Sequence, residues 1–506
     1  MRFLRRAAVV LVLALAGLGP VATVPAQTND LSGQTDVSIR NVLSLVAHHQ
    51  IVPLADGDYT PVNSLAAAKA AQPPAGITWS YPWGVALYGL LQASEATGDA
   101  DVENFAVNHD LICGRYYAWL KSLNTTLTNT SGLSSWQNST AIGGLMSQST
   151  SSMDGYGAMG AQMMETILNH TGGIAGPGQD AAGAAIANTI STRVPRLPDG
   201  TLYRPGSYGG TIWDDDLYMG CAFLVRWSAY TGDTNYLADA ARQILNVAGY
   251  DQSTNGLWWH GYFCNTYGSF SHTHSPVKWG RANGWAMVAT VEVLSALPVN
   301  DPARPQLLDI LRRHVEAVKP LQDAAGMWLQ VLDDTNNSAN WEETSCTGMF
   351  AYSLARAVNR GWIDPTNMAV AQKAFIGVCR HVTTNGVITG VCEGTNIGTN
   401  EDYYLQRTHP DDDPHGPGPV MLAGSEILLG TVAPPPPALR VAPANGQATI
   451  SWPAELTNYS VAGSIDLVNW TALSNAPVLA GGRQVVTNAV TGSRFYRLQF
   501  NAPSGR

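Results

Sequence analysis

The stretch WDDDLYMGCAFLVRWSAY (residues 213–230) places three consecutive carboxylates at the start of a helical pattern. Its apolar residues recur at Leu217, Cys221, Leu224 and Val225, the i, i+4, i+7, i+8 spacing of a helix that faces a core. Only 13% of the residues in the chain are charged, so three adjacent acids are an unusual concentration. The pattern predicts a core-facing helix whose N-terminal acids need a functional explanation.

Further helical patterns flank this one and return as pairs about every 60 residues, with no strand pattern between them. Repeated helix pairs favour an all-α, closed (α/α)6 barrel over an open solenoid, whose repeats would be more uniform. The predicted helices span residues 37–49, 84–96, 102–121, 156–168, 179–192, 216–230, 235–248, 282–296, 304–319, 345–358, 366–379 and 418–430.

The clearest boundary is VAPPPPALR, where four consecutive prolines make a stiff, extended spacer. Short runs rich in β-branched and aromatic residues follow it, such as ATISWPAE and RFYRLQF. We therefore expect a barrel at 27–431, a proline-rich linker at 432–438 and a small β-sandwich accessory module at 439–506.

The N-terminus predicts export. Residues 1–26 combine a basic start, an apolar run and a small-residue exit, as a secretory signal peptide does, so we expect a secreted or periplasmic protein. No later stretch is apolar for the roughly 18 residues that a membrane span needs. The formal charge of −10 makes nucleic acid an improbable partner. The sequence does not indicate an oligomeric state.

Aromatic residues and acids gather at the joints between the predicted helices. In a toroid these joints open at one end, and tryptophan faces stack on the apolar faces of sugars. Any one joint reads as an ordinary helix cap, but six together predict a carbohydrate pocket. The joints are WSYPWG (79–84), SMDGYG (152–157), TIWDDD (211–216), VKWGRANGW (277–285), NWEETS (340–345) and DDDPHGPG (411–418).

These segments, with GLWWHGYF and PHGPGPVMLAGSEIL, resemble the unsaturated rhamnogalacturonyl hydrolases of glycoside hydrolase family 105. That family is related to the unsaturated glucuronyl hydrolases of family 88. The resemblance extends in order from about residue 37 to 431. It implies an (α/α)6 barrel without metal or cofactor. The implied reaction removes a terminal 4,5-unsaturated uronic acid from oligosaccharides that polysaccharide lyases produce.

The resemblance also implies site residues. The proton-donating acid of the family falls on Asp215, and its earlier active-site acid, in a joint before a helix, falls on Asp154. The other matches, expected to bind substrate, are Tyr81, Trp213, Met219, His260, Trp279, Arg281, Trp285 and His415.

Hydration of an enol ether needs a protonated acid aimed at the alkene carbon, so Asp215 should keep its proton near neutral pH. We predict that the charges of Asp214 and Asp216 and the apolar walls of Trp213 and Met219 raise its pKa, while the helix N-terminus lowers it. One of the two neighbouring acids is expected to cap the helix.

Arg281 is expected to bind the uronate carboxylate, because a guanidinium pairs with a carboxylate through two parallel hydrogen bonds. His260 could instead be a satisfied core histidine. His272 and His274 could suggest a metal, but no acid stands nearby at ligand spacing, and a solvated loop is the better interpretation.

Two other functions remain open. A polysaccharide lyase or an ordinary two-carboxylate glycosidase could use the same toroid. A lyase would create the ultraviolet-absorbing double bond that the hydrolase removes. A non-catalytic carbohydrate-binding protein would leave the absorbance unchanged. Segments 122–152 and 264–277 are longer than the family core requires, which leaves the preferred leaving sugar open.

Overall fold

The computed structural model describes residues 36–431, 439–444, 446–453, 459–465, 469–480, 483–490 and 494–500. Contacts divide the chain into two compact units, one spanning Asp30–Ala433 and the other containing Pro434–Arg506. The predicted signal peptide and the predicted linker lie outside the described residues. Within the described part, we find no helix that combines the length and the apolar character of a membrane span.

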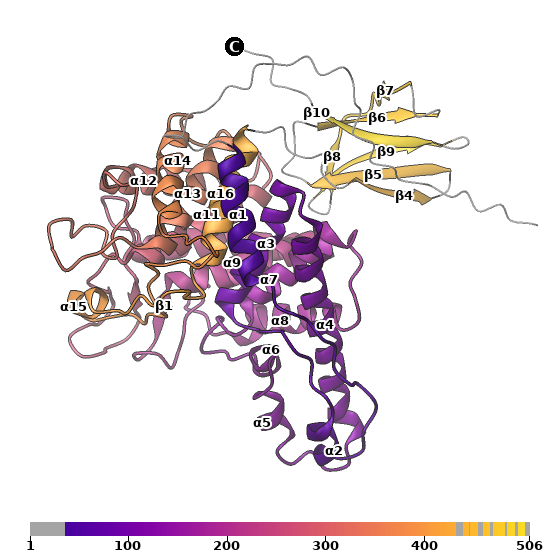
Figure 1. Ribbon diagram of the computed structural model, residues 1–506, viewed down its shortest axis with the longest axis horizontal. Helices are drawn as coiled ribbons and strands as arrows, with labels where there is room; N and C mark the ends of the chain where they lie inside the picture. Colours follow the sequence, from indigo (N-terminus) through magenta and orange to yellow (C-terminus); the bar gives the residue numbers. More distant parts are fainter. Residues whose placement is uncertain are drawn as a thin grey trace, which may run out of the picture. The chain divides into compact units, whose positions relative to one another are not determined.

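An inner ring of helices builds the larger unit, and each of these helices packs against the next (Figure 1). The last one packs back against the first and closes the ring. The predicted (α/α)6 barrel is therefore confirmed. The inner helices of the described residues are α3 (Tyr81–Thr97), α7 (Gly157–Glu165), α9 (Asp214–Thr231), α11 (Gly280–Ala296), α13 (Thr344–Asn359) and α16 (Pro417–Thr431).

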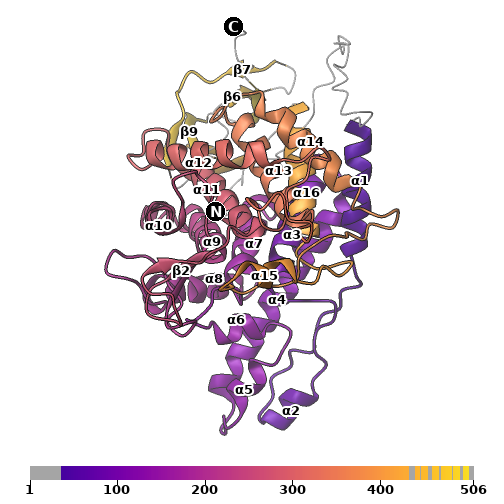
Figure 2. The same ribbon diagram turned by 90° about the vertical axis from the view of Figure 1, so that its left-hand side faces the viewer.

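The outer helices cover this ring and connect its members, as Figure 2 shows from the side. An inner helix such as α9 is buried from Asp214 to Ser228, whereas an outer helix such as α12 buries one face. Each predicted helix is present with shifted ends. The outer helices are α1 (Asp36–Gln50), α4 (Ala100–Thr126), α8 (Gln179–Asn188), α10 (Thr234–Asp251), α12 (Arg304–Val318) and α14 (Asn367–Cys379).

The expectation that no strands separate the helices was wrong. A three-stranded antiparallel sheet, β1 (Thr211–Trp213), β2 (Gly261–Phe263) and β3 (Thr273–His274), lies in the connections before α9 and α11. Strands of two or three residues are too short to show an alternating pattern. The chain also forms the short helices α2 (Leu65–Ala70), α5 (Leu133–Gln137), α6 (Gly143–Ser147) and α15 (Glu401–Leu405).

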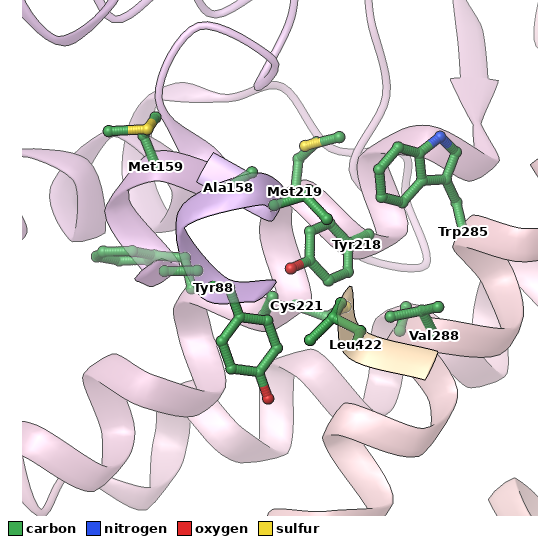
Figure 3. Packing of buried hydrophobic residues seen from close by; sticks show 14 of the residues in the cluster. Tyr88, Ala158, Met159, Tyr218, Met219, Cys221, Trp285, Val288 and Leu422 are labelled. Carbon is green, nitrogen blue, oxygen red and sulfur yellow. The ribbon is translucent and has the colours of Figure 1, made fainter. Parts of the chain in front are cut away.

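The interior of the ring is filled with side chains. Figure 3 shows Tyr88, Tyr218, Met219 and Trp285 packed together among the buried hydrophobic residues. Each of these four side chains is at most 3% exposed. The barrel is therefore a packed core, and chemistry has to take place at an end of it.

Two glycines let the inner helices approach closely at that end. A Cβ on Gly157 would lie 2.4 Å from the carbonyl oxygen of Met219, so only glycine lets α7 meet α9 there. A Cβ on Gly418 would lie 2.7 Å from the backbone of Val85, where α16 meets α3. These contacts hold the starts of neighbouring inner helices together.

The smaller unit contains two antiparallel sheets. One has the strand order β10-β6-β7 and the other β4-β5-β9-β8. Its described core includes Ile450, Trp452, Val461 and Val486, each at most 3% exposed. The strands are β4 (Arg440–Ala444), β5 (Gln447–Pro453), β6 (Tyr459–Ser464), β7 (Thr471–Ala472), β8 (Val478–Ala480), β9 (Arg483–Ala489) and β10 (Phe495–Phe500).

Candidate active site

The predicted site residues lie at or just before the N-termini of the inner helices. Tyr81 begins α3, Asp215 lies in the first turn of α9, and Arg281 lies in the first turn of α11. Asp154 and His415 lie in the joints before α7 and α16. The outer helix of each hairpin returns the chain to the same end of the barrel, so residues far apart in sequence meet there.

We use the name acid cluster for Asp154, Asp214, Asp215, Asp216 and Arg204. The guanidinium of Arg204 donates from Nε and Nη2 to the two oxygens of Asp216, each over 2.8 Å. Its Nη2 also donates to Asp154 Oδ1 over 2.9 Å. The predicted joints before α7 and α9 therefore meet at Arg204. This residue was not among those that the sequence singled out.

Local structure fixes Arg204 in this position. Its backbone exchanges hydrogen bonds with Thr211 of β1, and its guanidinium lies 4.0 Å from the ring centroid of Trp213. The charges of Asp216 and Asp154 overcome the effect of burial and raise the pKa of Arg204, so it stays a cation. Despite this pairing, burial raises the pKa of Asp216 to about 6.

The carboxylate of Asp214 has no hydrogen-bond partner among the described residues. It is fully buried, and the oxygens of the buried Asp251 also have no partner in this part of the chain. Burial, with the nearby charges of Asp251 and Asp215, raises its pKa well above the usual range. The expected capping role was wrong: Trp213 is the N-cap of α9 and makes no side-chain capping bond.

The expected rise in the pKa of Asp215 was also wrong. Burial raises this pKa, but His260, Arg204 and Arg281 together lower it below its ordinary value. The crowded acids that should have held the proton are outweighed by cations and by a histidine from other parts of the fold. In the free enzyme, Asp215 is therefore ionised near neutral pH.

His260 is buried beside Asp215. Its Nε2 lies 3.3 Å from Asp215 Oδ2, an ion-pair distance without hydrogen-bond geometry, and its Nδ1 lies 2.7 Å from the hydroxyl of Tyr404. The backbone N–H of Gly398 also donates to that hydroxyl oxygen. One ring nitrogen of His260 is thus bound to Tyr404, and the other faces Asp215.

Arg281 is buried and holds a neighbouring segment. Its two terminal nitrogens donate to the carbonyl oxygens of Cys392 and Glu393 over 2.5 and 2.7 Å. Its guanidinium lies 4.5 Å from the ring centroid of Trp279. Part of the fork that we expected to bind a substrate carboxylate therefore already holds residues 392–393, while its charge still acts on Asp215.

Tyr81 and His415 meet across the seam between α3 and α16. The Tyr81 hydroxyl lies 2.5 Å from His415 Nε2, and His415 Nδ1 lies 2.5 Å from Asp413 Oδ1. The edge of Trp285 packs against Tyr81 with ring centroids 6.4 Å apart. The charges of Asp154, Asp215 and Arg281 all act on the Tyr81 phenol, which places it within reach of the acid cluster.

The remaining predicted residues lie deeper. Met219 and Trp279 have no exposed area, and Trp285 is 2% exposed and stacks on Tyr218. Trp213 is 5% exposed. The structure thus buries Met219 and Trp279 in the supporting wall, whereas Tyr81 is hydrogen-bonded to His415 and experiences the charges of Asp154 and Asp215.

Three contributing residues were missed, namely Arg204, Tyr404 and Asp413. Arg204 had a usable signal, because it is the one cation between Arg196 and Arg226 and three acids follow it closely. Tyr404 lies on the short helix α15, which has no clear periodicity. His274, weighed as a metal ligand, stacks on Trp259, and the described residues contain no group of three or more metal-binding side chains.

Comparison with known proteins adds three findings. The sequence model described as Glycosyl Hydrolase Family 88 matches residues 62–429. An unsaturated 3S-rhamnoglycuronyl hydrolase of Alteromonas sp. (strain LOR) is 28% identical over 219 residues, which are 43% of this chain and 51% of the relative. An unsaturated rhamnogalacturonyl hydrolase, YesR of Bacillus subtilis (strain 168), is 24% identical over 363 residues, which are 69% of this chain and 90% of the relative.

A solved structure shares the fold. It comes from Salmonella enterica serovar Paratyphi A and is described as a possible member of the GH105 family. It superposes with a TM-score of 0.59 at 20% identity and covers 79% of this chain and 96% of its own.

Proposed function

Because this chain belongs to glycosyl hydrolase family 88, we propose that it removes a terminal 4,5-unsaturated uronic acid from short oligosaccharides by hydrating the double bond. The resemblance to families 105 and 88 that the sequence suggested is confirmed, and the chain is a glycoside hydrolase. The alternatives, a lyase and a non-catalytic binding protein, are not favoured. The single observation that carries the proposal is an aspartate, Asp215, held between a histidine and two arginines at the barrel end.

The arrangement suits a substrate that is itself an anion. His260, Arg204 and Arg281 keep Asp215 ionised in the free enzyme. The negative charge of a uronate carboxylate bound near the two arginines opposes their effect and raises the pKa of Asp215. Substrate binding thereby converts Asp215 into the protonated acid that the reaction needs.

The chemistry then follows in order. Asp215 gives its proton to C4, and the positive charge that develops at C5 is shared with the ring oxygen. Water adds to C5, and the resulting hemiketal opens and releases the neighbouring sugar. Asp154 and Asp216, locked on Arg204, fix the cation beside this centre.

The test uses unsaturated oligosaccharides prepared by lyase digestion of several acidic polysaccharides. We expect the ultraviolet absorbance of the double bond to disappear and, in heavy water, one solvent deuterium to appear at C4 of the released uronate. A lyase would increase the absorbance, a binding protein would leave it unchanged, and an ordinary glycosidase would leave C4 unlabelled. Comparing digests would also identify the polysaccharide that supplies the substrate.

Export is a second part of the proposal. Residues 1–26 carry the basic start, apolar run and small-residue exit of a signal peptide. Expression of the full chain in a bacterial host should give an exported product that begins at Gln27, which N-terminal sequencing checks. A cytoplasmic product that retains Met1 would contradict this.

A further inference from the structure

The Tyr81, His415 and Asp413 side chains form a continuous chain of hydrogen bonds that the steps above do not use. Both links are 2.5 Å long, and Asp413 Oδ1 also accepts the backbone N–H of His415 over 3.0 Å. Asp413 and His415 are each 7% exposed, so the outer part of the chain is shielded from water. A buried carboxylate that binds Nδ1 fixes the proton there and leaves Nε2 as an acceptor toward Tyr81.

The starts of α3 and α16 bring the residues of this hydrogen-bonded series together. Tyr81 is the first residue of α3, and the contact of Gly418 with Val85 brings the start of α16 against it. Gly394 leaves room beside the pair, because a Cβ there would stay 3.9 Å from both His415 and the Tyr81 hydroxyl. Tyr81 is thus hydrogen-bonded to His415, and the charges of Asp154 and Asp215 act on its phenol.

We propose that Tyr81, His415 and Asp413 form a proton relay that deprotonates the water attacking C5, with His415 as the base, Tyr81 as the bridge and Asp413 as the residue that positions His415. This inference rests on the proposed hydration reaction and assigns its second proton transfer. It separates the acid, Asp215, from the base that serves the nucleophile.

The step balances as follows. The π electrons of the C4–C5 bond take the Asp215 proton to form the new C4–H bond. The water oxygen bonds to C5 and gives one proton to the Tyr81 oxygen, while Tyr81 passes its own proton to His415 Nε2. The imidazolium beside Asp413 later releases this proton to solvent, which restores neutral His415, and Asp215 takes up a proton from solvent when the next substrate binds.

The charges around His415 suit a base. Burial and Arg281, from α11, lower its pKa, while Asp413 and Glu343, the residue before α13, raise it, and the net direction is down. His415 is therefore neutral and able to accept a proton near neutral pH. Burial raises the pKa of the Tyr81 phenol, so Tyr81 stays protonated and can act only as a bridge.

The decisive experiment follows turnover and substrate binding separately. Tyr81→Phe should lower kcat on the order of 10²-fold or more, with a much smaller change in KM. Calorimetric titration of this variant with an unsaturated disaccharide should give an affinity close to that of the wild type, because the relay acts on the attacking water and not on the bound sugar.

Asp413→Asn tests the positioning residue separately. Its amide oxygen still accepts the Nδ1 proton, but it supplies no charge to stabilise the imidazolium, so we expect a loss in kcat on the order of 10-fold, again with little change in KM. The matched control is Asp412→Asn. Asp412 pairs with His49 at the surface and has a φ of +63°, which asparagine tolerates, so its variant should keep wild-type kinetics.

The outcomes separate this inference from the proposed function. If the wild type fails to consume unsaturated substrate, the proposed function is wrong. If the wild type labels C4 but Tyr81→Phe keeps its kcat, or loses substrate affinity in proportion to its loss of kcat/KM, the relay is wrong. Should Tyr81→Phe not fold, Asp413→Asn with unchanged kcat would overturn the relay by itself.

Discussion

The inner helices carry charged residues at two levels, and the two levels treat charge differently. The first is the acid cluster at the helix N-termini. The second, which we call the core network, consists of Glu165, Arg226, Glu292, Tyr352, Arg356 and Glu426. Four residues of the candidate site precede a residue of the core network by eleven positions, which is close to three helical turns. The pairs are Asp154 with Glu165, Asp215 with Arg226, Arg281 with Glu292, and His415 with Glu426.

In the core network every charge has a partner. Glu292 accepts from Arg226 and Arg356 over 2.8 Å each and from the Tyr352 hydroxyl over 2.5 Å. Burial raises the pKa of Glu292, but the two arginines lower it further, so the net shift is down. Glu426 completes the pairing of Arg356. This network is a structural tie between helices.

The acid cluster contains four carboxylates and one guanidinium. Arg204 pairs with Asp154 and Asp216, so Asp214 has no partner and Asp215 depends on His260 and more distant cations. Buried charges that all have partners hold a structure together, whereas buried carboxylates without full pairing can gain or lose a proton.

Removing the proposed proton donor, Asp215, should have the largest effect on turnover. Asp215→Asn preserves the shape of the side chain, so the variant should fold normally and lose turnover on the order of 10³-fold or more. Asp214→Asn changes a neighbouring acid that cannot reach solvent and should stay within a few-fold of wild type. Steady-state kinetics on an unsaturated disaccharide checks both, and an active Asp215→Asn beside an inactive Asp214→Asn would reverse the assignment.

Breaking the core network should affect stability instead. Glu292→Gln leaves Arg226 and Arg356 without their shared counter-charge and should lower the free energy of unfolding by about 3–5 kcal/mol. The lowered pKa of Glu292 means that it stabilises the fold above the ordinary carboxylate range and less as pH falls through that range, so the difference should shrink in acid. Denaturant unfolding measures this, with the exposed Glu316→Gln as control. Equal losses from both variants would show that the network is unimportant.

Arg281 shares features of both levels. It donates hydrogen bonds to backbone carbonyl oxygens, and its charge still lowers the pKa of Asp215. Arg281→Lys keeps the charge but cannot hold Cys392 and Glu393 and also a substrate carboxylate. We expect kcat/KM to fall by the equivalent of about 1–3 kcal/mol. Unchanged kinetics would remove Arg281 from substrate recognition.

A smaller effect is expected for the stability of Asp214→Asn. The raised pKa of Asp214 means that the folded state keeps a proton that the unfolded state loses, so the wild type loses stability as pH rises above the ordinary aspartate range. Asparagine removes this cost and should stabilise the protein near neutral pH on the order of 1 kcal/mol. The gain should vanish in acid, where both states of the wild type are protonated. Thermal unfolding across pH measures it, and a loss at neutral pH would mean that Asp214 is ionised and paired.

The smallest effect is expected from removing the second unit. None of the residues in the acid cluster or the core network lies within 439–506. A chain ending at about residue 432 should therefore keep wild-type kinetics on disaccharides. A loss of activity there would mean that the C-terminal unit completes the site.

Much of the site could be predicted because its residues stand at helix starts, which sequence marks well. Asp154, Asp215, Tyr81 and His415 were all found in joints, and the closed toroid brings such joints together. Met219 follows Asp215 by four residues and so lies one turn further along the same face of α9, where the ring interior is packed and Met219 is buried.

The sequence by itself determined the helices, the closed barrel and the identity of the acids, because these depend on local periodicity and on short motifs. Only the tertiary structure decided which acid is ionised. That property depends on Arg204 in the connection before α9, His260 in the connection before α11 and Arg281 in the first turn of α11. Electrostatic interactions act through space at distances that chain spacing does not encode. The crowding of three aspartates was visible in the sequence, but the cations that reverse its effect on Asp215 became visible only in the fold.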